Sequence, residues 1–408
     1  MSADISSYLS TTTTLSSAEK ILYQEEILDK AKSRLIFDRY AYTKPIGRGD
    51  GGTYRIQKLL RQPVQTTADT EGYLYGYADA KKFTSESIDL TPENWGDSFV
   101  FSRKVPITVF LGDEEYQAEI ANQMARTLDR RVAEIIATRS LRWRIDKDAT
   151  YMKSGTVGAT VTSASSFYSN LTDGNDTYNG GVLAFTNPES AAYDEARKIT
   201  DFVQSDGVFT TTAFQNAPTA SASKFLATAG TGIASSDKLT TDGLLDVRAL
   251  HSELETEPFD GNTLQMFIHT ANERDLWDDT TWENTAIYDD SGRFANYQLV
   301  RWCGLNMHIS SNIYREDANG TENLDDGDVY CLPVIGRKAY ALMRWGQGMG
   351  DFGVDWEYKD SADTSDLRNK FRAISWDSHF ACDVTRATSV VTLLCGATGI
   401  GVSILNSN

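Results

Sequence analysis

The sequence predicts an α+β fold, because helical and strand-like patterns mix along the chain without a regular strand–helix–strand alternation. A strong helical pattern at 113–141 follows a stretch at 43–104 that has no convincing helix. The C-terminal half then mixes short helices and buried strands in no fixed order. With 408 residues, 40% apolar and 11% aromatic, the chain has enough apolar material for two or three domains or one elaborated domain.

The first hundred residues contain two segments that differ in composition and in the spacing of their apolar residues. Residues 16–42 carry apolar side chains at irregular helical spacing, which predicts a helix within an N-terminal arm that spans 1–42. Residues 43–104 are rich in glycine, threonine and charge, with strand-like pieces such as TYRIQKLL. They predict extended hairpin strands that do not form a core of their own.

The clearest helix in the sequence lies at 113–141. Its apolar positions recur every three or four residues, at Ile120, Met124, Leu128, Val132, Ile135 and Ile136. Acidic residues occupy its first turn, and Arg139 and Arg142 lie near its end, so both ends complement the helix dipole. At 1.5 Å per residue the helix would be about 40 Å long, a length typical of a structural spine.

Residues 151–240 are dominated by Ser, Thr, Ala, Gly and Asn, which predicts an inserted, loop-rich subdomain. Within it, 187–204 begins with Asn-Pro and has an apolar stripe at helical spacing, so we expect a helix there. Beyond it, the patterns predict helices at 240–255 and 271–279, and strands at 263–270, 297–313, 328–345 and 371–395.

The most apolar tract, 389–405, contains small residues and glycines and is short for a bilayer span. It predicts a buried pair of terminal strands, with a membrane anchor as the alternative. The net charge of −18 argues against a dedicated nucleic-acid or membrane binder. The N-terminus lacks the basic and apolar regions of a secretory signal, so we expect the protein to fold in the cytoplasm.

Four cysteines, Cys303, Cys331, Cys382 and Cys395, are too widely spaced for a metal clamp, and we expect reduced core residues. The four histidines, His251, His269, His308 and His379, also lack metal spacing. We expect His269 and His308 to be hydrogen-bonded strand residues. The acidic loop at 315–330 has the wrong register for an EF-hand, which favours a solvated loop. We therefore assign no catalytic, cofactor-binding or metal-binding residues.

The segment PIGRGDGGTYRIQ contains a G-x-G-x-x-G pattern and an Arg-Gly-Asp tripeptide. A dinucleotide site needs a strand before the glycines and a helix after them, and the residues that follow here have strand propensity instead. The tripeptide needs an extracellular setting that nothing else supports. The glycines Gly47, Gly49, Gly51 and Gly52 therefore predict a flexible turn between the N-terminal segment and the extended strands.

The order of these segments resembles the major capsid proteins of tailed double-stranded DNA phages, which share the Hong Kong 97 fold, and is most similar to the branch typified by phage N4. GGTYRIQKLLRQP at 51–63 resembles the start of the family's extended β-hairpin loop, and 105–151 resembles the end of that loop and the spine helix. The helix–strand–helix at 239–279 is similar to the axial domain. VIGRKAYALMRW and 374–395 resemble the late strands, whereas the strand region at 297–314 lacks the first glycine of the family pattern.

The resemblance implies a division into an N-terminal arm (1–42), an extended loop (43–104), a peripheral domain with the spine helix (105–150), an insertion (151–240), an axial domain (241–334) and a return to the peripheral domain (335–408). It implies that hexamers and pentamers of the chain build an icosahedral shell around double-stranded DNA, which they contact non-specifically. Scaffolding, portal and decoration proteins are implied partners, and the host bacterial cytoplasm is the implied place of assembly. We predict no covalent crosslink.

Within the extended loop, five cations are candidates for contacts with a neighbouring subunit's acidic surface: Arg55, Arg61, Lys81, Lys82 and Arg103. Solvated surface charges are the alternative for all five. In a shell, the glycines at 47–52 would act as a hinge that lets the loop swing. Two other functions stay open, a carbohydrate-binding or carbohydrate-active β-rich protein and another virion component such as a tail or decoration protein.

Overall fold

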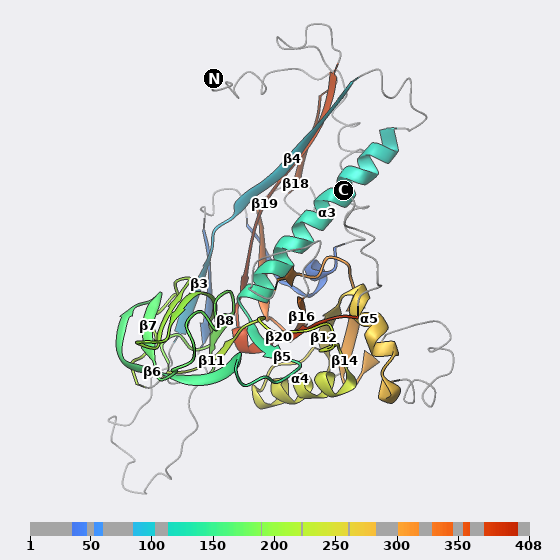
Figure 1. The fold of residues 1–408 in the computed structure, drawn as a ribbon. Helices are drawn as coiled ribbons and strands as arrows, with labels where there is room; N and C mark the ends of the chain where they lie inside the picture. Colours follow the sequence, from blue (N-terminus) through green and yellow to red (C-terminus); the bar gives the residue numbers. More distant parts are fainter. Residues whose placement is uncertain are drawn as a thin grey trace, which may run out of the picture.

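Helices and strands mix in the computed structural model as the α+β class predicts. The model describes residues 35–46, 53–59, 85–102, 113–188, 190–221, 223–259, 262–282, 301–317, 329–345, 354–359 and 371–398. A long helix and a bundle of long strands project from a body that contains a second sheet and a β-barrel, which lie side by side (Figure 1).

The projecting sheet is built around β19 (Phe371–Val384). One side of β19 pairs antiparallel with β4 (Glu93–Ser102) along ten residue pairs, from Phe371 opposite Ser102 to Phe380 opposite Glu93. The other side pairs with β18 (Val354–Lys359) and β17 (Tyr340–Trp345), and β17 also pairs in parallel with β1 (Tyr42–Ile46). The expected extended strands at 43–104 therefore join strands from the other end of the chain.

Helix α3 (Asp113–Thr138) runs along this sheet and confirms the helix predicted at 113–141, except that it ends three residues earlier. Its 26 residues make it about 39 Å long. The buried face includes Met124 and Ile136, and the indole of Trp376 on β19 donates to Gln123 at 2.8 Å. The guanidinium Nε of Arg142 donates to the Ala137 carbonyl at 2.9 Å, so Arg142 does complement the end of the helix.

The central sheet has the order β13 (Arg301–Trp302), β14 (Leu305–Ile309), β12 (Leu264–Ile268), β16 (Val329–Ile335), β20 (Val390–Cys395) and β5 (Leu141–Arg144), with β15 (Arg315–Glu316) paired to β16. β12 and β20 are buried along their whole length, as their mainly apolar sequences LQMFI and VVTLLC predict. The expected domain limits at 150 and 334 cut across this sheet, because β5 and β20 come from outside 241–334.

Helices α4 (Thr241–Glu253) and α5 (Thr270–Trp277) flank the central sheet and confirm the helices predicted at 240–255 and 271–279. The strand predicted at 297–313 is instead a hairpin, because Cys303 and Gly304 both have positive φ angles, 46° and 79°, and turn the chain between β13 and β14. Of the predicted terminal strand pair, β20 is present and buried, and residues 399–405 lie outside the described ranges.

The segment at 151–240, which we expected to be an inserted, loop-rich subdomain, contains a closed six-stranded barrel. Its strands are β6 (Met152–Ser163), β7 (Ser166–Ser169), β8 (Val182–Phe185), β9 (Ala196–Val203), β10 (Val208–Thr211) and β11 (Lys224–Thr228), in the order β10-β7-β6-β11-β8-β9. Aromatic rings fill the barrel, among them Phe167, Phe185, Phe202, Phe209, Phe225 and Tyr178. The first and last strands pair directly, with Met152 opposite Thr228, so the chain enters and leaves the barrel at one place.

The helix expected at 187–204 was wrong, since the structure forms strand β9 at Ala196–Val203 instead. A register shift opposite Thr210 and Thr211 leaves Thr200 as an extra residue in β9. The bulge separates the barrel-facing Ile199 and Phe202 by three positions instead of two. Ala196 faces the other way and packs in the main core. The apolar stripe that predicted a helix, Ala192, Ala196, Ile199 and Val203, therefore does not lie on one face of one element, because Ala196 packs in the main core and Ile199 in the barrel.

Two segments pack against the projecting sheet near its base. Strands β2 (Tyr54–Leu59) and β3 (Ser85–Leu90) form an antiparallel hairpin. Its inner face packs Ile88 and Leu90 against residues of β17 and β19. In the N-terminal segment, residues 35–42 form only a short 3₁₀ helix, η2 (Phe37–Tyr40), before β1 begins, and the rest of the helix expected within 16–42 lies outside the described ranges.

Candidate functional site

The titratable groups inside the body have structural partners. His269 caps α5, where its Nδ1 accepts from the Ala271 N–H at 3.1 Å, and burial lowers its pKa to about 4. His308 lies on β14 with its Nε2 2.8 Å from the Gln265 side-chain oxygen. Within the described ranges, no cluster of three or more His, Cys, Asp or Glu side chains suits a metal ion. None of the described helices has the length and apolarity that a membrane span needs.

Three of the four cysteines, Cys331, Cys382 and Cys395, are buried and free, as predicted. Cys303 is exposed, so the expectation of a core position was wrong for this residue. Its location follows from the turn between β13 and β14, where a left-handed backbone directs the chain around the end of the sheet.

Arg55 is the one predicted contact cation that falls in the described ranges. It lies on the exposed outer face of the hairpin and forms a two-pronged ion pair with Asp89 on the opposite strand, at 2.6 and 2.7 Å. An intramolecular carboxylate therefore already holds its guanidinium. The other four candidates, Arg61, Lys81, Lys82 and Arg103, lie outside the described ranges.

The predicted hinge glycines, Gly47, Gly49, Gly51 and Gly52, also lie outside the described ranges. The flanking strands show what this segment connects. β1 pairs along the edge of the projecting sheet, whereas β2 belongs to the hairpin that packs on the face of β17 and β19. At the base of the hairpin the hydroxyls of Thr53 and Thr91 lie 3.2 Å apart.

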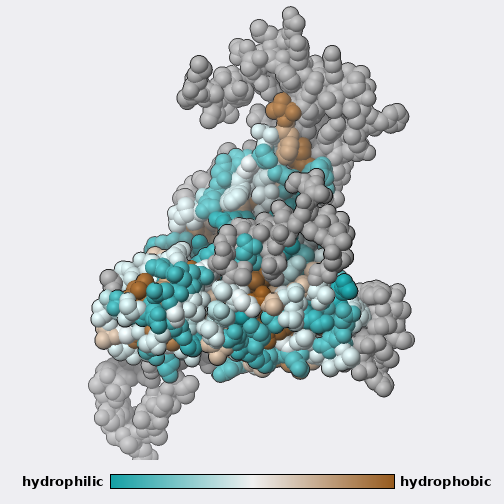
Figure 2. Space-filling model, viewed as in Figure 1, coloured by the Kyte–Doolittle hydropathy of each residue, from teal (hydrophilic) through white to brown (hydrophobic). Residues whose placement is uncertain are grey.

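The surface best suited to contact another molecule is the long strand β4. Among the described strands it pairs with β19 alone, so its outer edge presents ten residues of backbone. Trp95 and Phe99 pack toward the core, whereas Val100 is 65% exposed. In Figure 2 the brown, apolar residues include a group at the projecting end of the molecule. A long edge with an exposed apolar side chain is a typical docking strand.

Gly96 sits in the middle of β4 and brings it close to β19. A Cβ at this position would lie 2.6 Å from the Trp376 carbonyl oxygen, which is closer than a real contact allows. On the other face, Asp97 accepts from Gln123 of α3 at 2.9 Å, and the guanidinium of Arg131 lies over the Trp95 ring. Strand β4 is thus fixed both to the helix and to β19.

The N-terminal segment is anchored to α3 by a buried carboxylate. Asp129 accepts from the Ile36 N–H at 3.2 Å and is 2% exposed. Burial raises its pKa to about 7, although hydrogen bonds from the backbone of Ile36 and Phe37 and from Asn312 oppose that rise. The Tyr340 hydroxyl donates to the Phe37 carbonyl, so both ends of this short segment are held.

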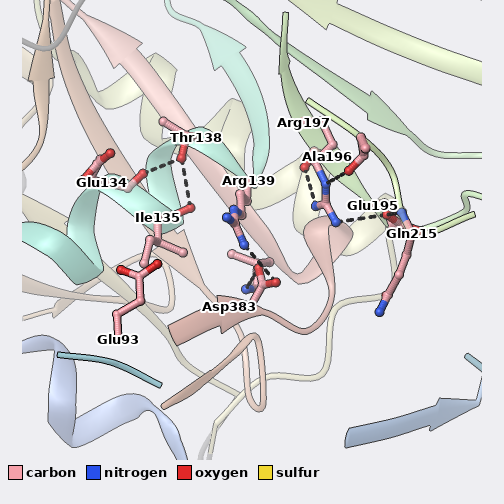
Figure 3. A network of polar contacts seen from close by, with 12 residues as sticks. Glu93, Glu134, Ile135, Thr138, Arg139, Glu195, Ala196, Arg197, Gln215 and Asp383 are labelled. Carbon is pink, nitrogen blue, oxygen red and sulfur yellow. Dashed lines mark hydrogen bonds and ion pairs between the residues drawn. The ribbon is translucent and has the colours of Figure 1, made fainter. Parts of the chain in front are cut away.

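Ion pairs gather where α3, the projecting sheet and the barrel meet (Figure 3). Arg139, just after α3, contacts Asp383 of β19 at 2.9 Å. On the barrel side, Arg197 contacts Glu195 at 3.1 Å, and Glu195 also accepts from the backbone of Gln215 at 2.8 Å. Deeper in the body, Arg142 forms a fully buried, two-pronged pair with Glu316 at 2.7 and 3.0 Å. This part of the molecule is therefore a junction of structural elements.

No protein-family model matches the sequence. No curated protein matches it either. The fold is similar to a chain in the capsid of cyanophage P-SCSP1u, with a TM-score of 0.51 and 10% identity over 89% of each chain. It is also similar to a chain of the cyanophage Pam1 capsid, with a TM-score of 0.51 and 10% identity over 98% of this chain and 99% of that one. The resemblance seen in the sequence is thereby confirmed for the overall fold.

Proposed function

We propose that the chain is a structural shell subunit, which assembles with copies of itself into the capsid of a tailed phage and encloses its double-stranded DNA. The observation that carries this proposal is the similarity in fold to the Pam1 capsid chain over nearly the whole length of both chains. A chain with this fold needs surfaces that bind other copies and needs no reactive group.

The described elements fit the parts of a Hong Kong 97-like subunit. We assign α3 to the spine helix and the hairpin β2–β3 to the base of the extended loop. The projecting sheet corresponds to the peripheral domain, the central sheet to the axial domain, and the barrel to an insertion. The long helix and the paired strands make a stiff arm that presents the β4 edge. Many weak contacts through such edges, repeated around a closed shell, give a large total avidity.

The proposed assembly follows the family plan of hexamers and pentamers on an icosahedral shell, with scaffolding, portal and decoration proteins as partners and the host bacterial cytoplasm as the place of assembly. The net charge of −18 fits a container whose wall must not bind its DNA tightly. We place the swing of the extended loop at the glycines 47–52. We retain Arg55, Arg61, Lys81, Lys82 and Arg103 as contact candidates.

Assembly is tested by light scattering and negative-stain microscopy of the purified protein, with and without a scaffolding partner. We expect closed shells. A protein that stays monomeric under every assembly condition would contradict the proposal, whereas tubes or trimers would point to a tail or decoration protein. Stabilisation of a monomer by glycans would point to a carbohydrate-binding protein.

A variant of the β4 edge separates assembly from folding. Val100→Asp places a charge on an exposed position, so the free energy of unfolding should change by less than about 0.5 kcal/mol. Because the charge would be desolvated in a contact between copies, we expect shell yield to fall at least about tenfold. Leu245→Asp, at a similarly exposed apolar position on α4, is the matched control. Equal shell yields from both variants and the unchanged protein would exclude the β4 edge as an assembly surface.

A further inference from the structure

The structure places a buried lysine where several parts of the molecule meet. Lys58 lies on β2 of the hairpin, and only 8% of it is exposed. Its ammonium donates to the backbone oxygen of Thr385 at 3.2 Å and to that of Asp194 at 3.5 Å. Lysine is rarely buried, because its ammonium loses hydration, so these contacts must compensate for that loss.

The two acceptors belong to different parts of the fold. Asp194 lies in the turn that leads from β8 to β9 of the barrel. Thr385 follows β19 directly, in the short segment 385–389 that connects the projecting sheet to β20 of the central sheet. The ammonium of Lys58 therefore joins the hairpin to the barrel and to the link between the two sheets.

Asp194 is held firmly on the barrel side of this contact. Its backbone is left-handed, with φ of 66°, and its carboxylate oxygen Oδ1 accepts from the N–H and the hydroxyl of Thr388 at 2.8 and 2.6 Å. Its backbone oxygen also accepts from the Ala387 N–H at 3.2 Å. The side chain of Asp194 thus fixes the position of the backbone oxygen that Lys58 uses.

The other contacts of the hairpin hold it in a different way. Its inner face packs Ile88 and Leu90 against small and flexible side chains of β17 and β19, among them Ala341 and Met343. The pair between Arg55 and Asp89 lies within the hairpin and does not tie it to the body. Around the junction, Arg139 pairs with Asp383 and Arg197 with Glu195 (Figure 3). Burial raises the pKa of the Asp194 carboxylate, and the positive charges of Lys58 and Arg386 oppose that rise.

We propose that Lys58 is a strap that couples the position of the hairpin to the barrel and to the link between the two sheets. When the turn at Asp194 moves, the ammonium loses an acceptor and the hairpin loosens. When the hairpin leaves the sheet, the barrel and the segment 385–389 lose a shared donor. This coupling is a property of the single subunit and goes beyond the proposed shell function, which its test does not require.

Hydrogen–deuterium exchange of the soluble full-length subunit tests the coupling from both sides. Lys58→Met keeps the length of the apolar stem and removes the donors, so we expect amide exchange in β2, β3 and 385–389 to become about tenfold faster. Asp194→Ala changes the side of the contact that belongs to the barrel. It removes the bonds to Thr388 and disfavours the left-handed backbone, and we expect faster exchange in β2 and β3 although the change lies in the barrel.

Two controls accompany these variants. Asp194→Asn retains an Oδ1 acceptor and tolerates a left-handed backbone, so its effect on hairpin exchange should be smaller than that of Asp194→Ala. Lys224→Met, on an exposed position of β11, should leave hairpin exchange unchanged. Hairpin exchange that stays at the wild-type rate in Asp194→Ala would overturn the proposal, even if Lys58→Met accelerates it. If Lys58→Met does not fold, the two Asp194 variants decide the question.

Discussion

The barrel and the central sheet build their apolar cores in different ways. The barrel core comes from one continuous segment, 152–228, and is mostly aromatic. The central sheet takes its strands from positions as distant as Leu141 and Cys395, and its core is mostly aliphatic. Only a few barrel residues, such as Val182 and Ala196, belong to the main core. The comparison indicates that the barrel can lose its packing while the central sheet keeps its own.

The substitution with the largest expected effect destabilises the barrel alone. Phe209→Ala removes a fully buried ring that packs against Phe167, Phe202 and Phe225, and should cost about 3–5 kcal/mol. We expect faster amide exchange in β6–β11 and unchanged exchange in β12 and β16. The matched variant Leu332→Ala, in β16, should instead accelerate exchange in the central sheet. Equal acceleration of both regions in Phe209→Ala would show that the two cores unfold as one unit.

The next effect concerns a buried carboxylate of the main core. The pKa of Asp129 is raised in the folded protein to about 7 from an unfolded value near 3.8. The folded state therefore binds an extra proton between these values. The stability from this group is fully present below about pH 4 and is lost as the pH rises through about 7, a change on the order of 4 kcal/mol.

Asp129→Asn removes this titration while keeping an acceptor for Ile36. As the pH rises from about 4 to about 8, the wild type should lose the stability that protonated Asp129 contributes, whereas the variant should not. We therefore expect the free energy of unfolding of the variant to increase relative to that of the wild type. Urea unfolding at several pH values measures it. A difference that does not depend on pH would mean that Asp129 has an ordinary pKa in the fold.

The smallest expected effect on the free energy of unfolding concerns the N-terminal cap of helix α4, which lies in the main body. Thr240 caps α4 by accepting from the Gly243 N–H at 3.3 Å. Thr240→Ala should cost about 1 kcal/mol, which is seen as a lower urea midpoint with an unchanged slope. Thr240→Ser, which keeps the hydroxyl, should stay within about 0.5 kcal/mol of the wild type. A loss in Thr240→Ser as large as in Thr240→Ala would assign the effect to the methyl group instead of the cap.

Local patterns predicted the elements whose type is decided by side-chain periodicity within the element itself. The apolar stripe of α3, the helix α4 and the buried strand β12 fall where their patterns place them. The predicted helix at 187–204 was wrong because its apolar stripe is divided between two cores, with Ala196 in the main core and Ile199 in the barrel. The hinge glycines and the five contact cations remain predictions, and all of them except Arg55 lie outside the described ranges.

The sequence by itself determined the helices α3, α4 and α5, buried strands such as β12 and β20, and their order along the chain, because side-chain periodicity within each element decides its type. The order of these elements in the sequence also made the similarity to the capsid fold recognisable. Only the tertiary structure decided that 151–240 closes into a barrel, that β5 and β20 lie side by side, and that Lys58 and Asp129 are buried. Those features depend on contacts between residues far apart in the chain, such as Lys58 and Thr385, and no local pattern specifies such pairings.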